Sequence, residues 1–232
     1  MTNLSGNQRG QYVQAMFARI APHYDRMNRL MTAGQDVRWR QEAIRQAALP
    51  PGGRLLDLGA GTGDLAAEAQ RQFPSSTVIA ADFTLEMMQF GRSLKDASLA
   101  WNGADALHLP FVDSSFDAVV SGYLLRNVSD LPQALAEQYR VLKPGGRLVA
   151  LDTTRPPRSL LSPLINFHLH TVIPALGRLL TGEAEAYTYL PDSTRQFLSA
   201  EQLAVHLVQT GFRRVCFRRL MFGTMALHWG IK

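Results

Sequence analysis

Hydrophobic positions follow two different rhythms along the 232-residue chain, and the change comes near residue 50. Between residues 8 and 48, apolar side chains recur at helical spacing, and Pro22 interrupts them. After Gly52-Gly53, short apolar runs alternate with amphipathic stretches. Strands that alternate with helices are typical of right-handed βαβ units, so this pattern predicts a parallel sheet.

The apolar runs that we expect to form this sheet are 54–59, 76–82, 99–105, a segment within 115–125, and 147–153. The helices expected between them are 64–73, 84–95 and 131–142. The last of these should be stopped by Pro144-Gly145-Gly146. A helix over 200–209 and two β-like runs, 213–220 and 224–231, are expected to close the chain.

Residues 156–195 interrupt this alternation with a helical repeat of apolar positions. Pro163 and Pro174 are expected to break the repeat into pieces. The whole chain then predicts one α/β domain with a central, mostly parallel sheet, an antiparallel C-terminal strand and a helical insertion. Its expected parts are a helical lid (1–48), a ligand-binding core (50–155), the insertion (156–198) and a C-terminal unit (199–232).

Composition narrows the class of protein. Hydrophobic residues make up 46% of the chain and charged residues 19%, which indicates a globular protein. The lone cysteine, Cys216, excludes a disulfide framework and fits a reducing compartment. Neither a secretory signal nor an 18-residue uncharged apolar run is visible, so we expect a cytoplasmic protein. The net charge of +5 is dispersed, which favours a solvated basic surface over a nucleic-acid site.

The sharpest local signal is LLDLGAGTGD at residues 55–64, where Gly59, Gly61 and Gly63 follow a predicted strand and open a predicted helix. A dinucleotide fingerprint needs glycine where this chain has Asp64, and an acid there repels a pyrophosphate. S-adenosylmethionine carries two positive groups, which suit the carboxylates of Asp57 and Asp64. We therefore favour S-adenosylmethionine, while a dinucleotide site or a plain tight turn stays as an alternative.

Acidic residues at the ends of the next predicted strands fit the same ligand. Asp82 can bridge two ribose hydroxyls, although a dinucleotide site would use an acid here too. Asp105, followed by Ala106, can accept from an adenine amino group, or it is a turn residue. Met87-Met88 either pack on adenine or belong to the core.

Over essentially its whole length the chain resembles the ubiquinone/menaquinone biosynthesis C-methyltransferases, the UbiE/Coq5 family. The glycine loop and the segment Leu142-Lys-Pro-Gly-Gly146 are shared by many methyltransferases. More specific are Tyr24-Asp25-Arg-Met-Asn28, Leu125-Arg-Asn-Val128 and Tyr187-Thr-Tyr-Leu-Pro-Asp-Ser193. The resemblance implies a Rossmann-like, class I adenosylmethionine-dependent methyltransferase. It also implies methyl transfer to a ring carbon of a polyprenylated quinol, with demethylmenaquinol as the expected acceptor.

The loop and the resemblance together predict one set of cofactor-binding residues. They are Asp57, Gly59, Gly61, Thr62, Gly63, Asp82, Asp105, Ala106 and Gly122. Gly122 stands where the family commonly has Ser, and Ser121 precedes it, so the source of that hydroxyl stays open. Tyr123-Leu124 replaces the family's Phe-Gly, and segments 35–39 and 151–156 also depart from its pattern. These departures lie on the expected substrate side and leave the quinol ring undecided.

A ring carbon becomes a good nucleophile when a neighbouring phenolic oxygen loses its proton, which needs a base or an oxyanion stabiliser but no metal. Arg126 and Asn127 follow the fourth predicted strand and are expected to stabilise the quinolate. Alternatively, Arg126 ties its loop to Asp105 or Asp25. Tyr24 and Asp25 are expected to close over the cofactor as part of a lid, or to form a helix-packing motif.

The insertion is the expected partner surface. Its apolar face (156–180) either forms a tunnel and membrane-touching face for the prenyl tail or is ordinary core. Tyr187 and Tyr189 either line the substrate mouth or anchor a loop. The tail length and the oligomeric state, a homodimer included, stay open, and peripheral contact with the inner membrane face is compatible with this pattern.

Three other functions compete with this prediction. Another small aromatic or lipid acceptor would use the same cofactor site. RNA methylation is less favoured, because the prolines typical of base amino methylation are absent after the fourth predicted strand. A non-enzymatic scaffold of a quinone-biosynthesis assembly is disfavoured by the intact glycine loop and Asp82.

Overall fold

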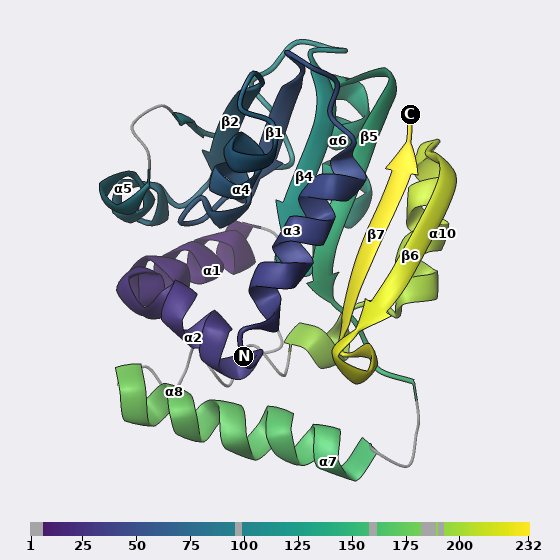
Figure 1. Ribbon diagram of the computed structural model, residues 1–232. Helices are drawn as coiled ribbons and strands as arrows, with labels where there is room; N and C mark the ends of the chain where they lie inside the picture. Colours follow the sequence, from purple (N-terminus) through teal and green to yellow (C-terminus); the bar gives the residue numbers. More distant parts are fainter. Residues whose placement is uncertain (1–6, 96–98, 158–161, 182–188, 190–192) are drawn as a thin grey trace.

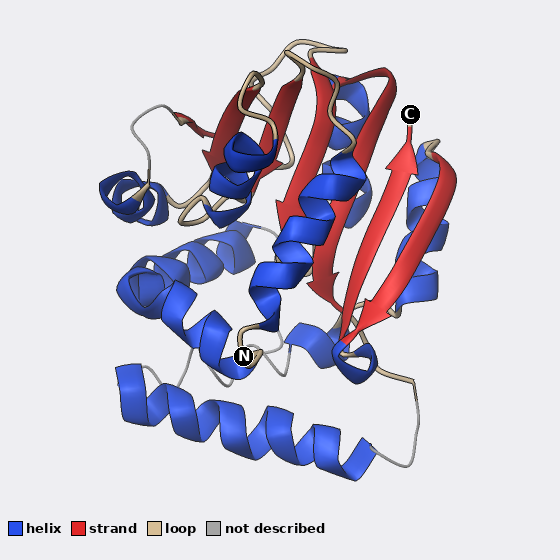
Figure 2. Cartoon of the chain, viewed as in Figure 1, coloured by secondary structure: helices blue, strands red, loops and turns tan. Residues whose placement is uncertain are grey.

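The computed structural model describes residues 7–95, 99–157, 162–181, 189 and 193–232. In this part of the chain one sheet runs in the order β3-β2-β1-β4-β5-β7-β6 (Figures 1 and 2). Its strands are β1 (Arg54–Leu58), β2 (Thr77–Asp82), β3 (Ala100–Gly103), β4 (Phe116–Gly122), β5 (Leu142–Thr153), β6 (Arg213–Leu220) and β7 (Met225–Ile231). Pairs among β1 to β5 are parallel, whereas β7 runs antiparallel to both β5 and β6. The predicted fold class is therefore confirmed.

Helices cover both faces of the sheet, and its central strands β1 and β4 are buried on both sides. Figure 1 shows α3 (Gln35–Ala47) and α4 (Asp64–Gln72) in front, with α6 (Leu131–Val141) and α10 (Ala200–Thr210) behind. Successive strand residues face opposite layers. Leu55 belongs to the core under α3 and α4, while Leu56 belongs to the core that includes Leu135 and Leu207.

The N-terminal helices lie across the edge where the parallel strands end (Figure 1). They are α1 (Asn7–Ile20), the 3-10 turn Ala21–His23 and α2 (Tyr24–Met31). Pro22 sits at the start of the 3-10 turn, as expected for a residue that cannot continue a helix. Met16, Ile20 and Met27 form a separate small core with Ile173 of α8 (Ile173–Thr181), which joins the N-terminal helices to the insertion.

The helix before Pro144-Gly145-Gly146 ends within one residue of its predicted end, but these three residues belong to a strand. The helix α6 ends at Val141, and Pro144-Gly145-Gly146 lie inside β5, next to a register shift against β4 where a missing N–H is tolerated. The prediction that Pro174 breaks the insertion is wrong for its described residues 162–181. Figure 1 shows α7 (Ser162–Phe167) and α8 as one rod, joined by the π-helical turn His168–Val172. That wider turn directly precedes Pro174, which cannot donate an α-helical hydrogen bond.

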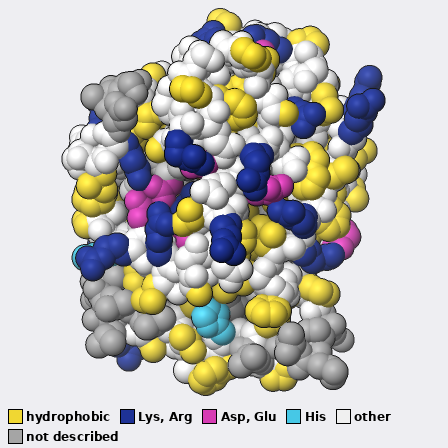
Figure 3. All heavy atoms as spheres, viewed as in Figure 1, with side chains coloured by type: hydrophobic (Ala, Val, Ile, Leu, Met, Phe, Trp, Pro, Cys, Tyr) yellow, Lys and Arg dark blue, Asp and Glu magenta, His cyan; other side chains and the backbone are white. Residues whose placement is uncertain are grey.

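The surface carries its basic charge in a dispersed form. Figure 3 shows Lys and Arg side chains in a band across the middle of one face, with acidic side chains between them. Several are ion-paired on the surface, including Arg45 with Glu42 and Arg71 with Glu68. No helix among the described residues is both long enough and apolar enough to cross a membrane.

Candidate active site

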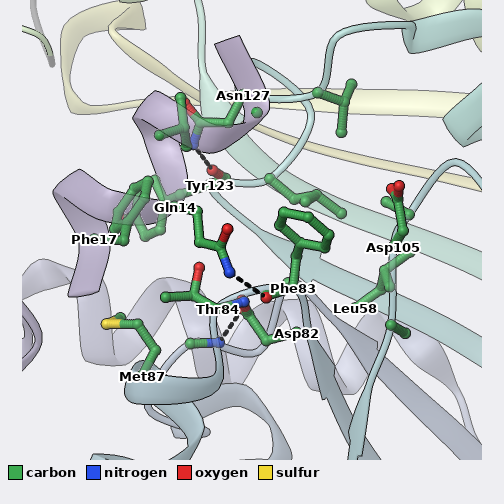
Figure 4. A pocket seen from close by; sticks show the side chains of 18 of the residues that line it. Gln14, Phe17, Leu58, Asp82, Phe83, Thr84, Met87, Asp105, Tyr123 and Asn127 are labelled. Carbon is green, nitrogen blue, oxygen red and sulfur yellow. Dashed lines mark hydrogen bonds between the residues drawn. The ribbon is translucent and has the colours of Figure 1, made fainter. Parts of the chain in front are cut away.

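A cavity of about 400 Å³ opens at the carboxyl ends of β1, β2 and β4, under α1 (Figure 4). Such a volume lies within the usual range for small-molecule sites. The predicted site residues that line it are Tyr24, Gly59, Gly61, Asp82, Asp105, Ala106, Gly122 and Asn127. Asp25, Asp57, Thr62, Gly63 and Arg126 are not among its lining residues, and each has a different position around it.

The glycine loop turns sharply because three of its residues adopt left-handed backbone. Gly59, Gly61 and Gly63 have φ of 69°, 57° and 82°. A Cβ on Gly63 would lie 2.6 Å from the ring of Trp101. The N–H groups of Gly59 and Ala60 donate to the carbonyl of Ala81 at 2.8 and 3.0 Å, which ties the loop to β2.

Asp82 is held rigidly at the end of β2 and lines the cavity. Its Oδ2 accepts from the Gly61 N–H and its Oδ1 from the Thr84 N–H, both at 2.7 Å (Figure 4). Burial nevertheless raises the pKa of Asp82, so its charge is not fully compensated. Because this carboxylate faces the cavity, it can also accept hydrogen bonds from two neighbouring ribose hydroxyls.

Asp105 lies just beyond β3 rather than on it, and it also lines the cavity. Its Oδ1 accepts from the Leu107 N–H at 2.9 Å, so it is a turn residue as well as a cavity residue. Ala106 and Met87 add apolar surface to the same wall. This wall can hold a flat base with a polar edge.

Gly122, and not Ser121, lines the cavity at the end of β4. Ser121 is only 2% exposed and lies in the strand. A Cβ on Gly122 would lie 3.0 Å from Leu65 Cδ1, tight but not impossible. The hydroxyl that the related family commonly offers here is therefore missing from this wall.

Asp57 and Asp64 do not face the cavity, contrary to the reasoning that both meet a cationic ligand. Asp57 is fully buried behind the loop, where its Oδ2 accepts from the Ala66 N–H at 2.8 Å. Burial raises the pKa of Asp57 to about 7. Burial also acts to raise the pKa of Asp64, but Arg40 at 3.0 Å and Lys95 outweigh it and hold this pKa low. The charge of Asp64 is thus neutralised inside the protein.

Thr62 and Asp25 join the N-terminal helices to the glycine loop. The Thr62 hydroxyl donates to Asp25 Oδ1 at 2.7 Å, across 37 residues of sequence. A second tie runs from Gln14 of α1, whose Nε2 donates to the Phe83 carbonyl at 3.2 Å (Figure 4). Tyr24 is buried beneath these ties, which raises its pKa. The N-terminal helices therefore close one side of the cavity.

Arg126 makes a buried ion pair, and its partner is neither of those considered from the sequence. Its Nη1 donates to Asp152 Oδ1 at 2.7 Å, and its backbone N–H donates to Asp152 Oδ2 at 3.3 Å. Both side chains are 2% exposed. Burial acts to lower the pKa of Arg126, but Asp152 outweighs it and raises this pKa. The pair ties the loop after β4 to the end of β5.

Asn127 is held on both sides. Its Nδ2 donates to the Tyr123 carbonyl at 2.8 Å, and its Oδ1 accepts from the Tyr189 hydroxyl at 3.1 Å. Tyr189 in turn packs against Tyr12 of α1, with ring centroids 6.1 Å apart. Tyr187 lies outside the described residues. Tyr189, which belongs to the insertion, therefore contacts both α1 and the cavity wall.

A second cavity, of about 530 Å³, lies beyond the first and is mostly apolar. Its lining comes from α2, the insertion and the turn before β7, and it includes Met31, Ile165, His168, Met225 and Arg126. Of the two interpretations of the insertion, a substrate face or ordinary core, this position favours the first. Within the part of the chain that is described, no three His, Cys, Asp or Glu side chains are grouped to hold a metal ion.

Comparison with known proteins decides the family. The model of the ubiE/COQ5 methyltransferase family matches residues 4–232. The chain belongs to this family. The ubiquinone/menaquinone biosynthesis C-methyltransferase UbiE of Desulfotalea psychrophila is 45% identical over 225 residues, which cover 97% of this chain and 92% of that protein. The demethylmenaquinone methyltransferase of Lactiplantibacillus plantarum is 41% identical, with 95% of each chain covered.

Solved structures show that this ubiE/COQ5 family member has a widely used fold. A possible histamine N-methyltransferase of Thermotoga maritima matches with a TM-score of 0.67 and 21% identity, over 94% of this chain and 98% of that one. The [4+2]-cyclase SpnF matches with a TM-score of 0.69 and 18% identity, over 98% and 96%. Since one of these is named a cyclase, the fold alone does not specify the reaction.

Sequence reasoning missed several residues of this ubiE/COQ5 site. Gly10, Val13, Gln14 and Phe17 of α1 line the first cavity, and their helical spacing could have indicated a shared face. Tyr123 was noted only as a departure from the family pattern, although it lines the first cavity and the second. Asp152 was noted only within the departing segment 151–156, and nothing in the sequence paired it with Arg126, which lies 26 residues away.

Proposed function

We propose that this chain transfers a methyl group from S-adenosylmethionine to a ring carbon of demethylmenaquinol, forming menaquinol. The observation that supports this proposal most directly is the pair of adjoining cavities. The first is lined by glycines and by acidic residues that hydrogen bonds hold in place, and the second is mostly apolar. Relatives at 40–45% identity over most of their length are named for this chemistry, which supports the assignment.

The first cavity suits S-adenosylmethionine by the chemistry of its walls. Asp82 offers two lone pairs to the ribose hydroxyls, and Asp105 offers an acceptor to the adenine amino group. Gly59 and Gly61 allow close approach of the backbone, which side chains would prevent. Asp57 lies behind the loop with its Oδ1 buried and unpaired among the described residues, so it would favour a cationic ligand through charge rather than contact.

When bound, S-adenosylmethionine supplies the methyl group: the ring carbon bonds to the methyl carbon, the methyl–sulfur bond breaks with its electron pair going to sulfur, and the ring carbon releases its proton. The residues of the chain provide alignment and exclude water. Thr62 and Asp25 hold the N-terminal helices over the site. Arg126, fixed by Asp152, lines the apolar cavity and places a positive charge where a quinolate oxygen develops.

The apolar cavity is proposed to receive the ring and the start of the prenyl tail. Two of its lining residues, Leu30 and Phe222, are 46% and 72% exposed, so its rim is apolar as well. An apolar rim suits an acceptor that is dissolved in a membrane. We therefore propose peripheral contact with the inner membrane face through this rim.

The test is methyl transfer by the purified full chain to reduced demethylmenaquinone, followed by mass spectrometry of the lipid. The expected product carries a methyl group on its ring in place of one hydrogen, so its mass increases by that of CH₂. Asp82→Ala should weaken S-adenosylmethionine binding by about 1–3 kcal/mol, because the ribose hydroxyls lose their acceptor. Asp113→Ala is the matched control, since the side chain of Asp113 is 76% exposed and remote from both cavities.

Binding of S-adenosylmethionine without methylation of this quinol would contradict the proposed acceptor. Methylation of other phenols in the same assay would then favour a different small aromatic substrate. Failure to bind S-adenosylmethionine would contradict the proposed enzyme and favour a scaffold role.

A further inference from the structure

Tyr123 lies at the boundary between the two cavities. It lines the first cavity together with Gly122 and Asn127, and it lines the second together with Arg126 and Thr153. Among the lining residues of the described chain, it alone belongs to both. A methyl group that passes from one cavity to the other must therefore pass near this side chain.

The backbone of Tyr123 is strained and firmly held. Its φ is 61°, in the left-handed region that bulky residues avoid. Its N–H donates to the Leu151 carbonyl at 2.7 Å, and its carbonyl accepts from Asn127 Nδ2 at 2.8 Å. Strained residues of this kind cluster at functional sites, where the surrounding structure fixes the direction of the side chain.

The second cavity contains buried polar atoms that lack a hydrogen-bond partner in the described part of the chain. They include three groups, the Tyr123 hydroxyl, Thr153 Oγ1 and His168 Nε2, besides the donor Asn28 Nδ2. Unpaired buried polar groups are rare in proteins because each one loses its hydration without compensation. Their grouping in one apolar cavity indicates a ligand that supplies the missing partners.

These three groups also restrict the chemistry of that ligand. A hydroxyl can donate or accept, and a neutral imidazole nitrogen can do either, depending on its tautomer. Such groups suit ligand hydroxyls, which likewise donate and accept. A carboxylate or phosphate would instead need several cationic donors, and Arg126 is the one Lys or Arg among the described lining residues of this cavity.

We propose that the Tyr123 hydroxyl binds one ring oxygen of a dihydroxy-aromatic acceptor and thereby selects an oxygenated ring and orients it toward the first cavity. Thr153 and His168 bind the remaining ring oxygen. This inference rests on the proposed function, because the acceptor ring occupies the apolar cavity. Tyr123 stands where the related family commonly has Phe, so its hydroxyl is expected to tune selectivity rather than to be required for turnover.

The test compares Tyr123→Phe with the wild type for binding of naphthalene-1,4-diol and of naphthalene, anaerobically and with S-adenosylhomocysteine present. We expect the wild type to prefer the diol, and Tyr123→Phe to reduce that preference by about 5–10-fold. The melting temperature should stay unchanged or rise, since the removed hydroxyl has no partner among the described residues. Tyr139→Phe is the matched control, because Tyr139 packs on Phe212 away from both cavities.

A Tyr123→Phe protein that keeps the full preference for the diol would overturn the inference. A wild type without that preference would overturn it as well. The readout is binding, so it is independent of methyl transfer. The two failures can be told apart. If the diol preference depends on Tyr123 but the protein does not methylate demethylmenaquinol, only the proposed function is refuted. If the protein methylates demethylmenaquinol but Tyr123→Phe leaves the diol preference unchanged, only this inference is refuted.

Discussion

Replacing Arg126 with alanine should reveal whether this residue acts first on stability or on catalysis. In the structure Arg126 and Asp152 are both 2% exposed, and they form a 2.7 Å ion pair. Arg126→Ala leaves the carboxylate of Asp152 buried without its cation. Breaking such a pair from one side typically costs about 3–5 kcal/mol of unfolding free energy.

That cost should appear as a large change in melting temperature. For a domain of this size, about 1 kcal/mol corresponds to roughly 2–4 °C, so we expect a fall of about 6–20 °C. Urea denaturation of Arg126→Ala, Asp152→Ala and the double variant measures the coupling. Each single change leaves one buried charge without its partner, whereas the double change leaves none. The loss of unfolding free energy in the double variant should therefore be smaller, by about 2–3 kcal/mol, than the sum of the losses in the two single variants.

Arg45→Ala is the matched control, since Arg45 pairs with Glu42 on the surface, where ion pairs contribute little. Arg126→Lys should recover part of the lost stability because it keeps the charge but not the planar fork. An Arg126→Ala protein with unchanged stability and reduced kcat would refute the structural assignment and restore a purely catalytic role for Arg126.

Three further predictions follow from single contacts. Burial raises the pKa of Asp57 from 3.8 to about 7, so the unfolded chain loses this proton at lower pH than the folded chain does. The free energy of unfolding should therefore fall as the pH rises between these two values. Asp57→Asn should flatten that part of the pH–stability curve, which urea denaturation measures. Gly63→Ala, whose Cβ would lie 2.6 Å from the ring of Trp101, should cost about 1–3 kcal/mol, and an unchanged melting temperature would contradict the loop geometry. Thr62→Val removes the hydroxyl that donates to Asp25, so S-adenosylmethionine should dissociate faster in stopped-flow measurements than from the wild type.

The sequence by itself determined the elements and the place of the first cavity. Alternating apolar runs predicted β1, β2 and β4 to within a few residues, because a strand buried on both faces needs a continuous apolar run. The glycines at 59, 61 and 63 predicted a sharp loop, since left-handed backbone is open to glycine at little cost. Asp82 could be placed because parallel strands end at one edge of the sheet.

The tertiary structure alone decided which charges meet and what each one does. Asp64 looks like a ligand for a cation when only its neighbours in sequence are considered, yet Arg40 and Lys95, 24 and 31 residues away, neutralise it. Arg126 pairs with Asp152 rather than with Asp25 or Asp105. Spacing along the chain carries information about local periodicity, whereas an ion pair depends on how whole helices and strands pack against each other.

The division of the site into two cavities is likewise a property of the packed chain. The rod of α7 and α8 lies beyond the N-terminal helices (Figure 1), and the second cavity is enclosed by segments from across the sequence. That Tyr123 lines both cavities could be recognised only from its backbone conformation and the positions of the two cavities. A side chain's environment depends on every element that surrounds it, and one-dimensional patterns describe only the element to which it belongs.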